Sequence, residues 1–246
     1  MNDERVVEDI VTKFLLNTCR LRPQLTRPAI EAAVRSALTE AVLETVDIGD
    51  TTLTKGSVAE FYIEPMYKSY VNDIDVMYYR STELAIPRGH PPPTQLPAEF
   101  HNYVQVCEII DSHFPGYVYL KLRYLLTECI DHGNYNAVEY DEQVYKSNRW
   151  HNYNTGIHGP ALHAGRQGRL LPSDTVLCMR CLVWPSQAAD WLTRYRSYGW
   201  PDSATVSRVV SNGCDVVPVA HRRCRQHEFM GKCQWRLSLS RAEIVL

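Results

Sequence analysis

The periodicity of apolar residues changes at Gly49, and this change constrains the fold more than any other feature of the chain. Before it, residues 3–18 and 28–46 carry apolar side chains at the i, i+3, i+4 spacing of amphipathic helices. After it, β-branched and aromatic residues dominate, and residues 71–79 are predicted to form a strand. Because helical and strand-like segments intermix without strict alternation, the pattern favours a mixed α/β or α+β sheet over a Rossmann or barrel fold.

The rest of the chain continues this mixture. Residues 98–114 return to helical spacing, whereas residues 116–124 alternate as a strand does. The proline-rich stretch 86–97 is expected to be a surface connection, and residues 131–170 are expected to form loops and short helical pieces. The other expected elements are strands at 174–183, 214–219 and 234–239, and helices at 186–198 and 203–212, the second closed by Gly213.

Composition narrows the class of protein. The 246 residues are 45% apolar and 22% charged, which is typical of globular proteins and excludes disordered, collagen-like and coiled-coil chains. No run approaches 18 apolar residues, so no membrane partner is expected. The first residues are charged, without the apolar segment of a secretory signal, and the eight cysteines are then expected to be reduced thiols. These features predict a cytoplasmic protein, with the nucleus as the alternative.

Charge is distributed unevenly along the chain. Residues 1–150 hold 14 Lys and Arg against 22 Asp and Glu, whereas residues 151–246 hold 12 against 6. An acidic first part and an arginine-rich second part are suited to face one phosphate ligand, with the acids holding metal between them. The alternative is that charges simply fall unevenly over a solvated surface.

The sharpest motif is Asp73-Ile74-Asp75. On a strand, both carboxylates point to the same face, about 7 Å apart at the backbone, and they repel unless a cation lies between them. The alternative is a solvated pair on an edge strand. The motif gains weight from Gly56 and Ser57, because a Gly-Ser step permits a tight turn and offers N–H groups and a hydroxyl to phosphate oxygens.

A third acid, Asp174, opens the apolar run at 175–183, where a carboxylate needs a cation or a partner. Its alternative is an ordinary acid at the start of a strand. A Gly-Ser step followed by a strand-borne Asp-x-Asp resembles the polymerase-β-like nucleotidyltransferases, in which a third carboxylate from another strand completes a two-metal site.

The cysteines offer weaker candidates for a metal site. Cys178 and Cys181 form a C-x-x-C pair, but on a strand two such residues point to opposite faces and cannot chelate one ion. The better zinc candidate is a cluster near the end of the chain, although its spacing fits no standard zinc finger. This cluster consists of His221, Cys224, His227 and Cys233.

The order of motifs is similar to the Mab-twenty-one nucleotidyltransferase family, which includes the cyclic GMP-AMP synthase (cGAS) and cGAS-like receptor type. Besides the acids and the Gly-Ser step, the resemblance is carried by Gly159-Pro160-Ala161, by the run from Asp174 to Pro185, by Val217 to His221 and by Trp235 to Glu243. It covers nearly the whole chain. The resemblance implies one domain over residues 1–246 with a polymerase-β-like core, a twisted mixed sheet flanked by helices, that lacks most of the family's C-terminal helical lobe.

The resemblance also implies residue roles. Two Mg²⁺ or Mn²⁺ ions would be held by Asp73, Asp75 and Asp174, and the donor triphosphate would be bound by Gly56 and Ser57. The bases would be contacted by Arg236. The nucleotide pocket would be lined further by Ser238, Ser240 and Glu243.

The function that the resemblance implies is synthesis of cyclic dinucleotides from ATP, GTP or other nucleoside triphosphates by two-metal phosphoryl transfer. Double-stranded RNA or another nucleic acid would be an activator, and the run at 222–225, with three arginines, is a candidate contact. One alternative is a catalytically silent nucleotide-binding or scaffold protein of the same family. Another is a non-enzymatic interaction module whose acids are merely surface residues.

Overall fold

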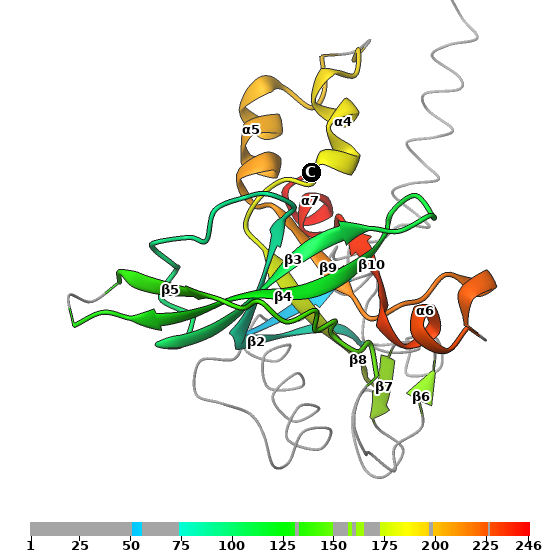
Figure 1. Cartoon of the computed structure of the whole chain (residues 1–246). Helices are drawn as coiled ribbons and strands as arrows, with labels where there is room; N and C mark the ends of the chain where they lie inside the picture. Colours follow the sequence, from blue (N-terminus) through cyan, green and yellow to red (C-terminus); the bar gives the residue numbers. More distant parts are fainter. Residues whose placement is uncertain are drawn as a thin grey trace, which may run out of the picture.

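Six strands of the chain close on themselves into a β-barrel, with strand order β2-β3-β4-β10-β9-β8 and a return pairing of β8 with β2 (Figure 1). The computed structural model describes residues 51–55, 74–130, 133–149, 157–158, 161–164, 173–196, 199–225 and 227–246. The barrel strands are β2 (Ile74–Pro87), β3 (Tyr103–Asp111), β4 (Tyr117–Glu128), β8 (Ser173–Cys181), β9 (Cys214–Val217) and β10 (Gln234–Ser238).

Within the described residues, four further strands extend this sheet. They are β1 (Thr51–Lys55) beside β2, β5 (Tyr135–Glu139) beside β4, and the hairpin of β6 (Ile157–His158) and β7 (Ala161–Ala164), which joins β8 through β7. β2 is parallel to both β3 and β8, whereas the other pairings are antiparallel.

The closed barrel corrects the expected fold class. The family resemblance implied a polymerase-β-like core with a twisted mixed sheet flanked by helices. Instead, strands make up 42% and helices 21% of the described residues, and the sheet closes into a barrel. Closure depends on an irregularity in β2: Tyr79 pairs with Cys178 and Leu84 with Arg180, so five steps of β2 match two of β8. Such an insertion bends a strand, which allows β2 to continue from its pairing with β1 into its pairing with β3.

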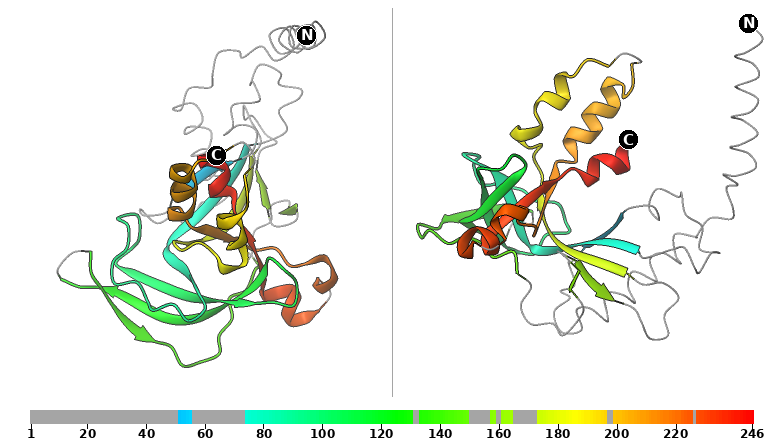
Figure 2. Two further views of the ribbon diagram at one scale, coloured as in Figure 1. Left: turned by 90° about the horizontal axis from the view of Figure 1, so that it is seen from above. Right: turned by 90° about the vertical axis from the view of Figure 1, so that its right-hand side faces the viewer.

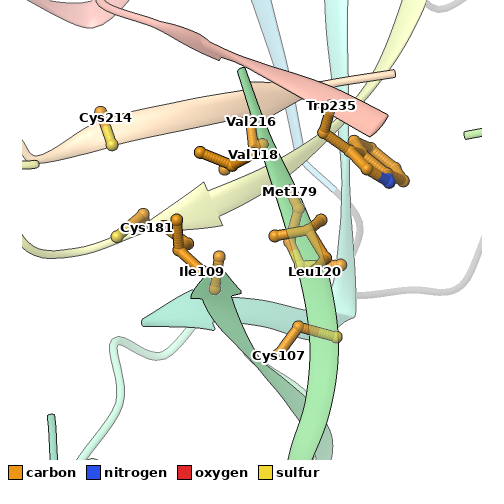
Figure 3. Packing of buried hydrophobic residues seen from close by; sticks show 10 residues of the cluster. Cys107, Ile109, Val118, Leu120, Met179, Cys181, Cys214, Val216 and Trp235 are labelled. Carbon is orange, nitrogen blue, oxygen red and sulfur yellow. The ribbon is translucent and has the colours of Figure 1, made fainter. Parts of the chain in front are cut away.

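The barrel interior is filled by apolar side chains from all six strands, as Figure 3 shows. Alternate residues of a barrel strand point inward, so this cluster defines the inner face of each strand. The buried members are Ala85, Cys107, Ile109, Val118, Leu120, Met179, Cys181, Cys214, Val216 and Trp235. Residues between them in each strand lie on the outward face.

Three short helices, α4 (Asp190–Thr193), α5 (Ser203–Ser211) and α7 (Ser240–Val245), lie together over one part of the barrel, and α6 (Glu228–Cys233) lies apart from them (Figures 1 and 2). Two 3-10 turns are η1 (Ser186–Ala188) and η2 (Arg222–Cys224). Helix α5 begins where Asp202 accepts a hydrogen bond from the Thr205 backbone N–H at 2.7 Å, and it ends before Gly213, whose φ is +65°.

Several predicted elements are confirmed. The strands predicted at 116–124, 214–219 and 234–239 correspond to β4, β9 and β10, and the helix predicted at 203–212 is α5, followed by Gly213 as expected. The strands predicted at 71–79 and 174–183 overlap β2 and β8, although β2 continues to Pro87.

Other predictions are wrong or lie outside the described residues. The helix expected at 98–114 is strand β3, and the loops expected at 131–170 contain β5, β6 and β7. The helix expected at 186–198 is reduced to η1 and α4. The helices expected at 3–18 and 28–46 lie outside the described residues. None of the helices in the described ranges has the length and apolarity that crossing a membrane requires.

Truncation of a barrel-filling side chain should be costly. Leu120 is fully buried within the barrel cluster, whereas Leu192 on α4 is 37% exposed. We expect Leu120→Ala to lower the free energy of unfolding by about 2–5 kcal/mol, because the cavity it leaves cannot collapse in a closed barrel. Leu192→Ala should cost less than about 1 kcal/mol. Equal losses in urea denaturation of the two variants would contradict the position of the core.

Candidate functional site

Asp75 and Asp174 lie directly beside each other, on neighbouring parallel strands. They are register partners in the pairing of β2 with β8, which places their backbones about 4.8 Å apart. Asp75 is exposed and Asp174 is half-buried. Register partners share a face of the sheet, and for Asp174 this is the outward face, because Met179 and Cys181 point inward. Two acidic side chains from distant parts of the sequence therefore meet on the outside of the barrel.

Some of the other predicted site residues lie outside the described residues. Asp73, Gly56 and Ser57 are among them. Gly56 and Ser57 follow directly in the chain after Lys55, the last residue of β1, and Lys55 is the register partner of Asp75. The Gly56-Ser57 step, which is predicted to bind the triphosphate, therefore follows in sequence the β1 residue that is paired with Asp75.

An apolar band follows the acids along the outward face. Its buried members are Met77, Tyr79, Cys178 and Val217, with Val176 and Val219 packed against them. Cys178 belongs to this outward cluster and Cys181 to the barrel interior, which confirms that the two cysteines point to opposite faces.

A buried ionic cluster lies at the far end of the same face. Asp215 on β9 is fully buried, and its two carboxylate oxygens divide their partners: Oδ1 accepts from Arg241 Nε at 2.9 Å, and Oδ2 accepts from the Tyr79 hydroxyl at 3.0 Å. Arg180 Nη1 lies 3.8 Å from Oδ1 and donates to the backbone oxygens of Cys181 and Cys214. The Arg241 guanidinium also stacks over the Tyr79 ring, 4.6 Å from its centre.

Burial and mutual interaction shift the pKa values of Tyr79, Arg180 and Arg241 in this cluster. Burial, and then the negative charge of Asp215, raise the pKa of the Tyr79 hydroxyl far above its ordinary value, so it remains a neutral donor. Burial, and then the positive charge of Arg241, lower the pKa of Arg180. Burial also favours a lower pKa for Arg241, but the interactions of Arg241 with Asp215 and Tyr79 outweigh burial, so the pKa of Arg241 is raised. The cluster therefore places two arginines and a neutral tyrosine hydroxyl around one acidic residue.

The predicted nucleotide-facing residues lie on the outward face or beside it. Arg236 is exposed and is the register partner of Val217, and Ser238 is the register partner of Asp215, so both belong to this face. Ser240 begins helix α7 rather than continuing the strand, and its hydroxyl lies 2.9 Å from that of Ser238. Glu243 is exposed on α7.

Two histidines of the proposed zinc cluster have other partners. The ring of His221 stacks on Phe114 with centroids 3.9 Å apart, and its Nδ1 accepts from the Arg223 backbone. His227 caps α6 by accepting from the Met230 backbone N–H at 3.1 Å. Across the described ranges, no three His, Cys, Asp or Glu side chains form a group that could hold a metal ion.

Sequence reasoning missed Tyr79, Arg180, Asp215 and Arg241 as members of one site. A signal was present, because Arg180 and Asp215 each interrupt an apolar strand, and a charge in such a strand needs a partner. What the sequence lacked was the antiparallel register that places Arg180 opposite Asp215. No protein-family model matches this sequence.

Proposed function

We propose that this protein is a metal-dependent nucleotidyltransferase, and that it forms cyclic dinucleotides from nucleoside triphosphates such as ATP and GTP. The observation that carries the proposal is the side-by-side position of Asp75 and Asp174, which the motifs alone predicted to act together. The closed barrel differs from the fold that the family resemblance implied. The proposal therefore rests on the site and on the quoted motifs, not on the architecture.

The donor set fits hard divalent cations. Carboxylate oxygens are ligands that Mg²⁺ and Mn²⁺ prefer, and the strand register brings two carboxylate residues together. Asp75 and Asp174, with Asp73 preceding Asp75 by two residues, would hold two such ions. When bound, these ions supply acidity to an attacking hydroxyl and positive charge to a leaving pyrophosphate.

The chain's own residues would bind and orient the nucleotides. The exposed guanidinium of Arg236 is suited to contact a base edge or face, and the Ser238 and Ser240 hydroxyls are suited to hydrogen-bond a nucleotide. Gly56 and Ser57 would receive the triphosphate beside Asp75, since they follow its register partner Lys55.

A turnover assay tests the proposal. The protein is incubated with all four nucleoside triphosphates and Mg²⁺ or Mn²⁺, without nucleic acid, with double-stranded RNA or with double-stranded DNA, and products are identified by mass spectrometry. We expect a metal-dependent dinucleotide product that EDTA abolishes. Nucleotide binding without product in any arm would instead favour the alternative, a silent nucleotide-binding scaffold. Absence of both would contradict the proposal.

A further inference from the structure

The ionic cluster on β8, β9 and α7 carries more positive than negative charge. Arg180 and Arg241 both lie within 3.8 Å of the same oxygen of Asp215. The Tyr79 hydroxyl is neutral, and within the described ranges neither arginine forms an ion pair with another carboxylate. Two cations therefore share one anion in a place that is largely removed from water.

This imbalance calls for an anion. Charges withdrawn from water are stable only when they are paired, and the lowered pKa of Arg180 reflects its burial and its repulsion by Arg241. The Arg180 and Arg241 side chains keep 12% and 20% of their surface exposed, whereas Asp215 keeps none. Both arginine side chains therefore extend to the protein surface, whereas the carboxylate does not.

The neighbouring hydroxyls define which anion fits. Ser238 is the register partner of Asp215, which is in turn opposite Arg180, so Ser238 and Arg180 lie in one row across three strands. The Ser238 and Ser240 hydroxyls are 2.9 Å apart, and Arg241 follows Ser240 directly. Guanidinium forks combined with hydroxyl donors suit the several oxygens of a phosphate group.

We infer that Arg180 and Arg241, together with the hydroxyls of Ser238 and Ser240, form a binding site for a phosphate group on the outward face of the barrel. Asp215 and Tyr79 hold the two arginines in place, since Asp215 contacts both and the Tyr79 ring lies under the Arg241 guanidinium. Because the Arg241 guanidinium already rests on the Tyr79 ring, its side chain loses little conformational freedom when it binds a phosphate group.

This phosphate site is separate from the acid pair. Arg180 lies six residues beyond Asp174 on the same strand, about 20 Å along it. A phosphate held here is thus not the group that Asp75 and Asp174 would act on, and its binding requires no metal. The phosphate belongs either to a nucleotide, in which case the site extends the proposed nucleotide pocket at Ser238 and Ser240, or to a free polyphosphate.

Calorimetric titration in EDTA tests the inference independently of catalysis. The probes are inorganic tripolyphosphate and ATP, at ionic strength matched with sodium chloride. We expect Arg180→Met and Arg241→Met each to weaken binding of tripolyphosphate about tenfold or more, because each removes charge-assisted hydrogen bonds. Arg80→Met is the matched control, since Arg80 is 40% exposed and pairs with Glu83 instead of Asp215. The affinity of this variant for tripolyphosphate should stay within about twofold of wild type.

The outcomes separate the explanations. Tighter binding of ATP than of tripolyphosphate would assign the site to a nucleotide, and the reverse to a free polyphosphate. No binding by the wild-type protein, or equal binding by wild type and both methionine variants, would overturn the inference. Where a methionine variant does not fold, the lysine variant at the same position keeps the charge beside Asp215 and should bind more weakly than wild type, and undiminished binding by it would count against the site.

Discussion

Asp174→Asn is expected to abolish nucleotidyl transfer while leaving the fold intact. Asp174 lies beside Asp75 on the outward face, away from the apolar barrel interior. In the proposed site, loss of one carboxylate would misplace the metal charge, on which several kcal/mol of transition-state stabilisation would depend. Turnover should therefore fall on the order of 10³-fold or more. The free energy of unfolding without metal should change by less than about 1 kcal/mol, because Asp174 lies outside the barrel interior and asparagine has nearly the same size.

The matched control for this variant is Asp141→Asn, which changes an exposed acid in the loop after β5. It should retain wild-type turnover. The two variants are compared by initial rates with Mg²⁺ and by thermal denaturation in EDTA. If Asp174→Asn loses activity only in proportion to a loss of folded protein, the acid has a structural role and the assignment fails.

Gly213→Ala is expected to destabilise the protein strongly, although it adds only one methyl group. Gly213 has a φ of +65°, which costs a residue with a side chain about 1–2 kcal/mol. In addition, an added Cβ would meet the backbone of Cys181 and Leu182, with the Leu182 carbonyl carbon only 2.7 Å away. Because backbone atoms at the end of a barrel strand cannot move aside cheaply, we expect a total loss of about 4 kcal/mol or more.

Gly116→Ala separates the two causes. Gly116 also has a positive φ, +77°, but an added Cβ there would meet nothing within 4 Å. It should lose only the conformational part, about 1–2 kcal/mol. Denaturant unfolding of both variants measures the difference, and equal losses would show that the close approach of Gly213 to β8 is absent in solution.

The sequence predicted the local elements best where apolar spacing was regular. In β4, inward Val118 and Leu120 alternate with outward residues, so the strand was evident. In β3, Val104 and Val106 pack into one buried cluster and Cys107 and Ile109 into the barrel interior, so both faces of the strand are buried. A strand buried on both faces lacks the simple apolar and polar alternation, so the segment 98–114 has a spacing that resembles a helix, and the prediction failed there.

Closure of the sheet could not be predicted, because it depends on long-range pairing. The irregular part of β2 contains the charged residues Arg80 and Glu83. In the sequence, charged residues at this point indicate the end of a strand rather than a bend within one. Glu83 is nevertheless buried, and its carboxylate is held by Lys146 at 2.6 Å and by Arg80 at 3.3 Å. Only the structure shows that this segment joins two halves of a barrel.

The candidate site was predictable in part for the same reason. Asp75 and Asp174 were recognisable because each lies at the start of an apolar strand, where a carboxylate needs a role. The cluster around Asp215 was not, because its members come from four separate elements and converge only through strand register and the docking of α7. Local patterns identify single residues, whereas an ionic cluster requires the tertiary fold.

The most direct test of the proposed metal site is product formation by Asp75→Asn beside wild type, with all four nucleoside triphosphates and saturating Mn²⁺. Asp75 is exposed and remote from the barrel interior, so its variant should fold. We expect wild type to form a dinucleotide, detected by mass spectrometry, and Asp75→Asn to form none. Equal product from both proteins would contradict the assignment of Asp75 and Asp174 as the metal-binding acids.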